Sequence, residues 1–215
     1  MAAERPGRPL ERPVLPIAAT RSADSRAPYD PNIDIIAAAI YGAVPVTDTK
    51  LLATAALLRS QWADPSSPNS YYPINGADQQ RGIGPLLGRY PGDTYDGDTA
   101  DEPVRGHPWA VSTANFAELY YQLAKQVTTT RSVPLDTLSA GFFSQIGVNT
   151  STTPQQAAAN LESHGDQMLR AVVFHSDHFE LSEQFDANSG FEKSVSNLSW
   201  SYASFLSALR AKNAI

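Results

Sequence analysis

From residue 32 onward, apolar residues recur three and four positions apart, which is the spacing of one buried face of an α-helix. The pattern predicts a helix over residues 33–40 that stops near Gly42. A second helix follows Thr47 or Asp48, either of which can cap its first turn. The apolar faces of these two helices consist of Ile33, Ile36, Ile40, Leu51, Ala55, Leu58 and Trp62.

Four further helices are predicted, from Pro108 to about residue 127, from Pro134, from residue 154, and over residues 198–210 behind Asn197. Proline suits the first turn of a helix, where its missing N–H has no partner to lose. Thr153 and Gln156 match a capping box at the start of the third of these helices. The predicted buried positions are Phe116, Tyr120, Leu123, Val127, Leu135, Leu138, Phe142, Phe143, Leu161, Gly165, Met168, Val172, Tyr202, Phe205 and Leu209.

No convincing run of alternating apolar and polar residues appears, so the sequence predicts an all-α domain. Two connections between the predicted helices are long, at residues 63–107 and 175–197, and the first is rich in Pro, Gly, Asp and Tyr. Loops of such length inside a compact domain are uncommon and often functional. We therefore expect the functional side chains in these two connections.

Residues 1–31 have a different composition, with six prolines and five arginines. Their apolar stretch, residues 14–19, is short and interrupted by Pro16, which does not fit a signal peptide. We expect a disordered Pro/Arg-rich leader over residues 1–31, no signal peptide in this chain, and one folded domain over residues 32–215.

Charge and composition exclude several classes of function. The 215 residues include 16 basic and 22 acidic side chains, a net charge of −6, which argues against a nucleic-acid or anionic-membrane binder. No apolar run approaches the roughly 20 residues of a membrane helix, and no cysteine is present. The four histidines are scattered, so no metal site is predicted. The acidic run at residues 93–102 leaves calcium as an alternative, although it lacks the glycine and distal glutamate of an EF-hand loop.

The long connections combine aromatic residues, an arginine and carboxylates, in residues 88–95 with 106–109 and in residues 181–186 with 198–202. Aromatic faces stack on sugar rings, and Arg and Asp form charge-assisted hydrogen bonds to hydroxyl groups. A pair of carboxyl groups carries out glycoside hydrolysis. This mixture of residues is therefore typical of a sugar site.

At these residues the sequence resembles the glucoamylases of glycoside hydrolase family 15. Residues 88–95, which read Gly-Arg-Tyr-Pro-Gly-Asp-Thr-Tyr, and Pro108-Trp109 resemble the family's Gly-Arg-Tyr-Pro-Glu-Asp and Gly-Asn-Pro-Trp segments. Residues 182–185 and 198–203 resemble its Ser-Glu-Gln-(Tyr/Phe) and Leu-Thr-Trp-Ser-Tyr-Ala segments, and the order agrees over roughly residues 32–212. The resemblance implies a partial (α/α)6 toroid, about half of the barrel, that corresponds to the C-terminal half of the catalytic domain.

The resemblance also implies an inverting exo-hydrolase that releases glucose from the non-reducing ends of α-1,4-glucans, with no cofactor and no metal. Glu183 takes the place of the general base, and Ser194 that of a serine that bonds the base carboxylate. The residues that match sugar-binding positions of the family are Arg89, Asp93, Trp109, Leu198 and Trp200.

The residues alone leave structural alternatives open. Glu183 fits a solvated loop glutamate, Arg89 with Asp93 fits a loop ion pair, and the two tryptophans fit core positions. The sequence also departs from the family pattern, with Gly92 in place of its glutamate and His107 in place of its asparagine.

The Trp-Glu-Glu and Trp-Thr-Arg-Asp segments of the family, which carry the general acid and a glucose contact, have no counterpart in this sequence. We therefore expect a truncated or mis-spliced product that is weakly active or inactive, because one acid or base group contributes about 10²–10⁴-fold to the rate. Two other functions stay open. One is a non-catalytic half-barrel with a residual sugar pocket, and the other is a specificity for α-1,6-glucan or trehalose.

The expected partner is an α-glucan oligosaccharide or polysaccharide, with no nucleic acid and no membrane. Self-association through the uncovered face of a half-barrel is a further expectation, because exposed apolar surface favours association. The resemblance implies an extracellular location, and the glycosylation motif at residues 149–151 is compatible with secretion.

Overall fold

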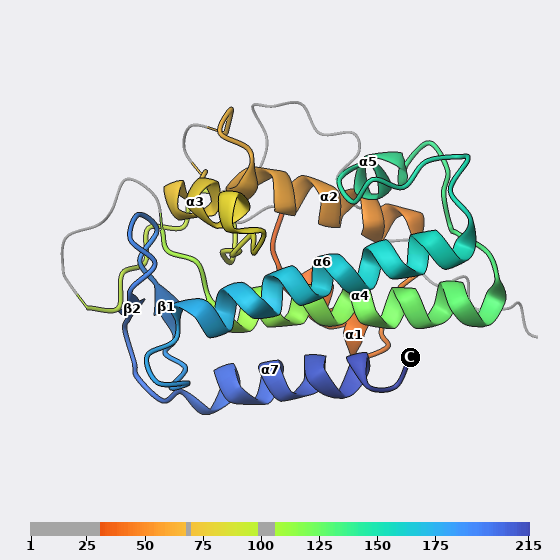
Figure 1. Ribbon diagram of the computed structural model, residues 1–215. Coiled ribbons are helices and arrows are strands. Elements are labelled where there is room, and N and C mark those ends of the chain that lie inside the picture. The colour runs from red at the N-terminus through yellow and green to blue at the C-terminus, as the bar shows by residue number, and fades with distance from the viewer. Residues whose placement is uncertain (1–30, 68–69, 99–105) are drawn as a thin grey trace, which may run out of the picture.

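The computed structural model describes residues 31–67, 70–98 and 106–215, so the predicted leader lies outside the described residues except for Pro31. The described residues form helices and one short hairpin (Figure 1). The helices are α1 (Asp34–Ile40), α2 (Thr49–Ala63), α3 (Pro73–Arg81), α4 (Ala110–Thr130), α5 (Ala140–Ser144), α6 (Pro154–His175) and α7 (Ser199–Lys212). The strands β1 (Gln184–Phe185) and β2 (Glu192–Lys193) pair antiparallel between α6 and α7.

Helix α4 is the centre of the domain. It packs on α6, α7 and α1, and Figure 1 shows α6 alongside it, α7 on one side of this pair, and α2 and α5 on the other. Its side chains are buried around most of its circumference, including the predicted Phe116, Tyr120, Leu123 and Val127. The predicted apolar faces of α1, α2 and α6 are buried against this core as well.

The predicted caps are present. The Asp48 carboxylate accepts hydrogen bonds from the backbone N–H groups of Lys50 and Leu51, at 2.9 and 3.0 Å. The Thr153 hydroxyl accepts from the Gln156 backbone at 3.3 Å, and the Gln156 side chain accepts from the Thr153 backbone at 3.0 Å. These contacts satisfy N–H groups that the first turn of a helix leaves without a partner.

Three sequence predictions about helices were wrong. Residues 73–81, predicted as loop, form α3, whose nine residues include only one large apolar residue, so no periodicity marked it. The helix expected from Pro134 begins at Ala140, because the Ser139 hydroxyl donates to the Pro134 carbonyl and holds a turn there. The helix expected from Pro108 begins at Ala110, since the extended backbone of Trp109 bridges to Gln184.

The predicted buried face of α7 also differs from the observed one. The fully buried positions are the small residues Ser201, Ser204 and Ala208, which allow close packing on α4. Tyr202, Phe205 and Leu209 are half-buried at its side, and Leu138, predicted as buried, is 45% exposed.

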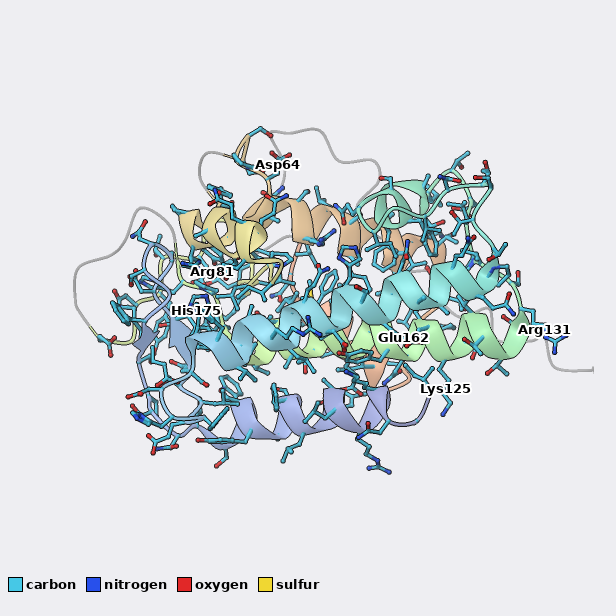
Figure 2. All side chains as sticks on the ribbon, in the orientation of Figure 1. Asp64, Arg81, Lys125, Arg131, Glu162 and His175 are labelled. Carbon is cyan, nitrogen blue, oxygen red and sulfur yellow. The ribbon has the colours of Figure 1, made fainter. Side chains whose placement is uncertain are left out.

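The first turns of α4 and α7, the last turn of α6 and the hairpin meet at one end of the molecule (Figure 1). Helix α3 is held at this end by Asp78, a fully buried carboxylate 2.9 Å from the His175 Nε2 atom and 3.3 Å from Arg81 Nη1. Figure 2 shows Arg81 and His175 at this end, away from Lys125 and Arg131 at the other. Both long connections therefore reach the same region. Within the described residues, no helix combines the length and apolarity that crossing a membrane requires.

Candidate functional site

Arg89 and Asp93 form a two-pronged ion pair in the first long connection. The Arg89 Nε and Nη2 atoms each donate to one oxygen of the Asp93 carboxylate, both at 2.8 Å, and Asp93 is only 2% exposed. Burial lowers the pKa of the Arg89 guanidinium, but the hydrogen bonds and charge of Asp93 outweigh this and raise it above its usual value. The pair is thus a clamp fixed by two charge-assisted hydrogen bonds, and its arginine side stays partly accessible.

An aromatic wall lies against this clamp. The Arg89 guanidinium lies 4.3 Å from the Trp109 ring centre and 5.1 Å from the Tyr95 ring centre. Trp109 is 2% exposed and contacts Trp200 edge to face at 5.9 Å, whereas Trp200 is 48% exposed. Trp109 extends the core outward, and Trp200 presents an aromatic surface to solvent at the start of α7.

Glu183 lies between the start of α4 and the hairpin. Its backbone N–H donates to the Val195 carbonyl at 2.9 Å, and its carbonyl accepts from the Ala110 N–H at 3.2 Å. The Ser194 hydroxyl donates to Glu183 Oε2. Glu183 is 9% exposed, so it is not the solvated loop glutamate of the alternative interpretation.

The structure brings the predicted site residues together at this end of the molecule. Glu183 and the clamp are linked at the start of α4, because the Glu183 carbonyl accepts from the Ala110 N–H and the ring of the preceding Trp109 packs against Arg89. Leu198 is held by its backbone N–H, which donates to the Leu181 carbonyl at 3.0 Å, beside Trp200. The ion pair of Arg89 with Asp93 and the 2% exposure of Trp109 also fit the structural alternatives, a loop ion pair and a core position.

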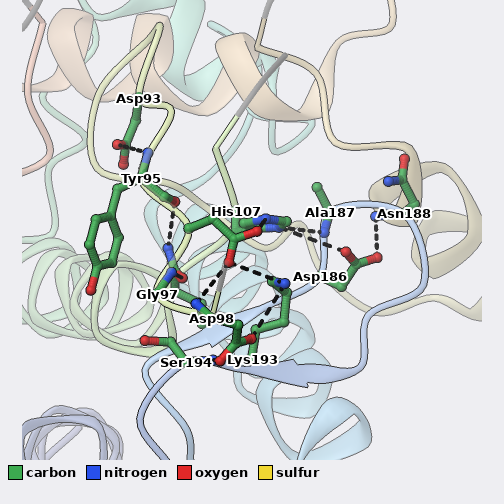
Figure 3. Close-up of polar contacts among 12 residues, drawn as sticks. Asp93, Tyr95, Gly97, Asp98, His107, Asp186, Ala187, Asn188, Lys193 and Ser194 are labelled. Atoms are coloured by element: carbon green, nitrogen blue, oxygen red, sulfur yellow. Dashed lines mark hydrogen bonds and ion pairs between the residues drawn. The ribbon is translucent and has the colours of Figure 1, made fainter. Parts of the chain in front are cut away.

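Several residues that hold this site were not singled out from the sequence (Figure 3). The buried Gln184 side chain donates to the Tyr95 carbonyl at 3.2 Å and accepts from the Gly97 N–H at 3.3 Å. Asp98 Oδ1 accepts from the Ser194 N–H at 2.9 Å. Gln184 directly follows Glu183, and Asp98 belongs to the acidic run, so only their neighbours in sequence signalled them.

Two aspartates of the acidic run, Asp96 and Asp98, pair with one lysine, whereas residues 99–102 of the run lie outside the described residues. Lys193 Nζ is 3.2 Å from Asp96 Oδ1 and 3.4 Å from Asp98 Oδ2. Burial raises the pKa of the Asp96 carboxyl, but the Asp98 backbone N–H and Lys193 outweigh it and lower that pKa to about 2. In the described part of the chain, no group of three or more His, Asp and Glu side chains is arranged to hold a metal ion.

The arrangement joins a half-open cation–carboxylate clamp, an exposed aromatic face and a carboxylate with its own hydroxyl donor. These are the groups that recognise a polyhydroxylated ring and act on a bond beside it. An all-α domain with these groups fits the sugar site that the sequence predicts.

Comparison with known proteins identifies the family. The sequence pattern of the family described as Glycosyl hydrolases family 15 matches residues 17–210, so the chain belongs to glycoside hydrolase family 15. It is 30% identical over 173 residues to Glucoamylase 1 of Rhizopus oryzae, a match that covers 76% of this chain and 27% of the relative. It is also 30% identical over 167 residues to a Saccharomyces cerevisiae protein named "Glucoamylase, intracellular sporulation-specific", covering 68% of this chain and 30% of that protein.

The fold comparison agrees. The family 15 glucoamylase of Hypocrea jecorina superimposes with a TM-score of 0.70 at 25% identity, over 86% of this chain and 31% of that structure. The domain is therefore part of an (α/α)6 barrel, which confirms the predicted fold class. The chain spans about three tenths of the length of the relatives it matches.

Proposed function

We propose that this chain carries the base side of a glucoamylase-type site, which removes glucose from the non-reducing ends of α-1,4-glucans with inversion. In this proposal Glu183 is the general base that activates water. Arg89 and Asp93 bind hydroxyl groups of the terminal glucose, while Trp109 and Trp200 form the walls of the first subsites. Ser194 orients the base, and the Leu198 backbone contacts the sugar.

The observation that carries the proposal is one hydrogen-bonded carboxylate held beside the aromatic wall of a charged clamp. Glu183 accepts from Ser194, and its backbone carbonyl accepts from Ala110, next to the Trp109 ring on which the Arg89 guanidinium packs. A base must be held by fixed donors at a defined place beside the reacting carbon. A structural glutamate would need neither the clamp nor the half-exposed tryptophan beside it.

Inversion needs a second carboxyl group about 6.5–9.5 Å from the base, to protonate the leaving oxygen. None of the segments that resemble the family supplies this acid. We therefore propose that the isolated chain is slower than a complete family member by about 10²–10⁴-fold, the contribution of one acid group. The site surrounds the terminal sugar, so it does not separate α-1,4-glucans from α-1,6-glucans or trehalose.

We also propose an extracellular location, from the resemblance to glucoamylases. One relative is named as intracellular, so location varies within the family. Fractionation of the source cells, with immunodetection of this chain in the medium and in the lysate, tests this point.

The test of the proposed reaction is glucose release from maltoheptaose by the purified 215-residue chain, with Glu183→Gln as the matched variant. We expect slow release that yields β-glucose first, seen by ¹H NMR of the anomeric proton, and its loss in the variant. Glu180→Gln is the control, because that carboxylate is exposed and only accepts from the Asn197 side chain. Release that is equal in the wild type and in Glu183→Gln would contradict the assignment of the base.

A further inference from the structure

His107 occupies the position where the family resemblance expects an asparagine, and its side chain is nearly buried at 5% exposure. Its ring lies between the two long connections (Figure 3). The Nδ1 atom is 3.1 Å from the Ala187 backbone nitrogen, and Nε2 is 3.3 Å from Asp96 Oδ2. The imidazole therefore touches the segment after β1 on one side and the acidic run on the other.

These two contacts fix the tautomer. A backbone N–H can only donate, so Nδ1 must accept from Ala187 and carry no proton. A neutral ring then has its proton on Nε2, which donates to Asp96. Asp186 Oδ2 is 3.9 Å from Nδ1, beyond hydrogen-bond distance, and so does not compete with Ala187 for this atom.

A chain of contacts connects Asp96 to the candidate base, Glu183. Lys193 bridges Asp96 and Asp98, and Asp98 accepts from the Ser194 N–H. Ser194 in turn donates to Glu183. Gly97, between the two aspartates, lies so close to Ser194 that a Cβ atom added there would be 1.9 Å from its hydroxyl oxygen. The position of Ser194 is thus set by the segment that His107 holds.

We propose that His107 is a positioning residue, whose neutral Nε2–H form holds residues 96–98 against the hairpin and so fixes Ser194 beside Glu183. The proposal rests on the proposed function, because fixing Ser194 matters only if Glu183 is the base.

Two substitutions separate the two contacts of the ring. In His107→Asn the side-chain oxygen takes the place of Nδ1 and keeps the Ala187 contact, but nothing reaches Asp96. In His107→Gln the amide nitrogen takes the place of Nε2 and keeps the Asp96 contact, but Ala187 loses its acceptor. Amide hydrogen exchange, measured by NMR on the full chain, reads each contact separately.

We expect His107→Asn to speed exchange of the Ser194 N–H about tenfold and to leave the Ala187 N–H unchanged. His107→Gln should give the reverse pattern. His175→Asn is the matched control, since His175 is an equally buried imidazole bound to an aspartate outside this network. It should destabilise the fold without producing either pattern. In the wild type, long-range ¹H–¹⁵N spectra should show the Nε2–H tautomer for His107.

Equal acceleration of both amides in both variants, or no acceleration in either, would overturn the proposal, as would an Nδ1–H tautomer. A parallel titration with maltotriose separates this result from the proposed function. If the exchange patterns appear and the wild type does not bind maltotriose, the positioning of Ser194 stands and the proposed sugar site fails. If the wild type binds, His107→Asn should bind about tenfold more weakly than His107→Gln.

Discussion

The Ser194 hydroxyl donates its hydrogen bond to Glu183 Oε2 from a residue whose own backbone is left-handed, with φ at 65°. A non-glycine residue in this region costs about 1–2 kcal/mol, and such strain persists where surrounding contacts impose it. The contacts here are the Asp98 carboxylate on the Ser194 N–H and the close approach of Gly97.

At position 194 the hydrogen bond stabilises the folded protein, whereas the left-handed backbone destabilises it. Ser194→Ala removes the hydrogen bond and keeps the strain, so we expect a loss of about 2 kcal/mol in the free energy of unfolding. Ser194→Gly removes both, and should be about 1 kcal/mol more stable than the alanine variant. Urea unfolding of the three proteins measures this. A glycine variant less stable than the alanine variant would show that the backbone is not strained.

The segments that carry the candidate site residues were easier to recognise from the sequence than the elements that support them. Residues 88–95 and 182–185 were recognisable because their chemistry lies in contiguous segments. Helix α3 was missed because its residues are mostly polar and are ordered by Asp78, which binds His175 in the distant α6. The roles of Gln184, Lys193 and Asp98 depend on contacts between segments about 90 residues apart, which no local pattern encodes.

The clamp predicts that arginine and lysine are not equivalent at position 89. Arg89→Lys replaces the planar fork of two nitrogens with a single nitrogen, which cannot match both carboxylate oxygens of the buried Asp93. We expect a loss of about 2 kcal/mol in the free energy of unfolding, below the 3–5 kcal/mol of a fully buried pair because Arg89 is 31% exposed. Asp93→Asn, measured in the same urea series, should be destabilised as well. A lysine variant as stable as the wild type would contradict the structural importance of the two-pronged contact.

The buried His164 imidazole should make the free energy of unfolding depend on pH. Burial, assisted by the nearby positive charge of Arg59, lowers the pKa of its imidazole from 6.5 to about 4. The unfolded chain therefore binds a proton at higher pH than the folded one, and stability falls as the pH falls from about 6.5 to about 4. His164→Gln removes this titration, so its loss of stability between pH 7 and 4.5, followed by urea unfolding, should be smaller than that of the wild type. An identical loss in both proteins would exclude His164 as a source.

Exposed apolar side chains predict self-association of the chain. Phe174 at the end of α6 is 57% exposed, and Leu206 on α7 is 62% exposed. Large apolar groups in such positions favour contact between molecules. We expect sedimentation velocity to show concentration-dependent association, reduced by Leu206→Glu. Lys125→Glu, a charge change of larger size on α4, is the control. A monomer at all concentrations would contradict this prediction.

The most direct test of a sugar site formed by the two long connections is a titration of the ¹⁵N-labelled chain with maltotriose. The three tryptophans report from different places, because Trp109 and Trp200 line the proposed site and Trp62 is 1% exposed in the core. We expect the indole N–H signals of Trp109 and Trp200 to shift with a common dissociation constant, the Trp62 signal to change least, and Asp93→Asn to weaken the response. Unchanged signals of Trp109 and Trp200 at saturating maltotriose would contradict the proposed sugar site.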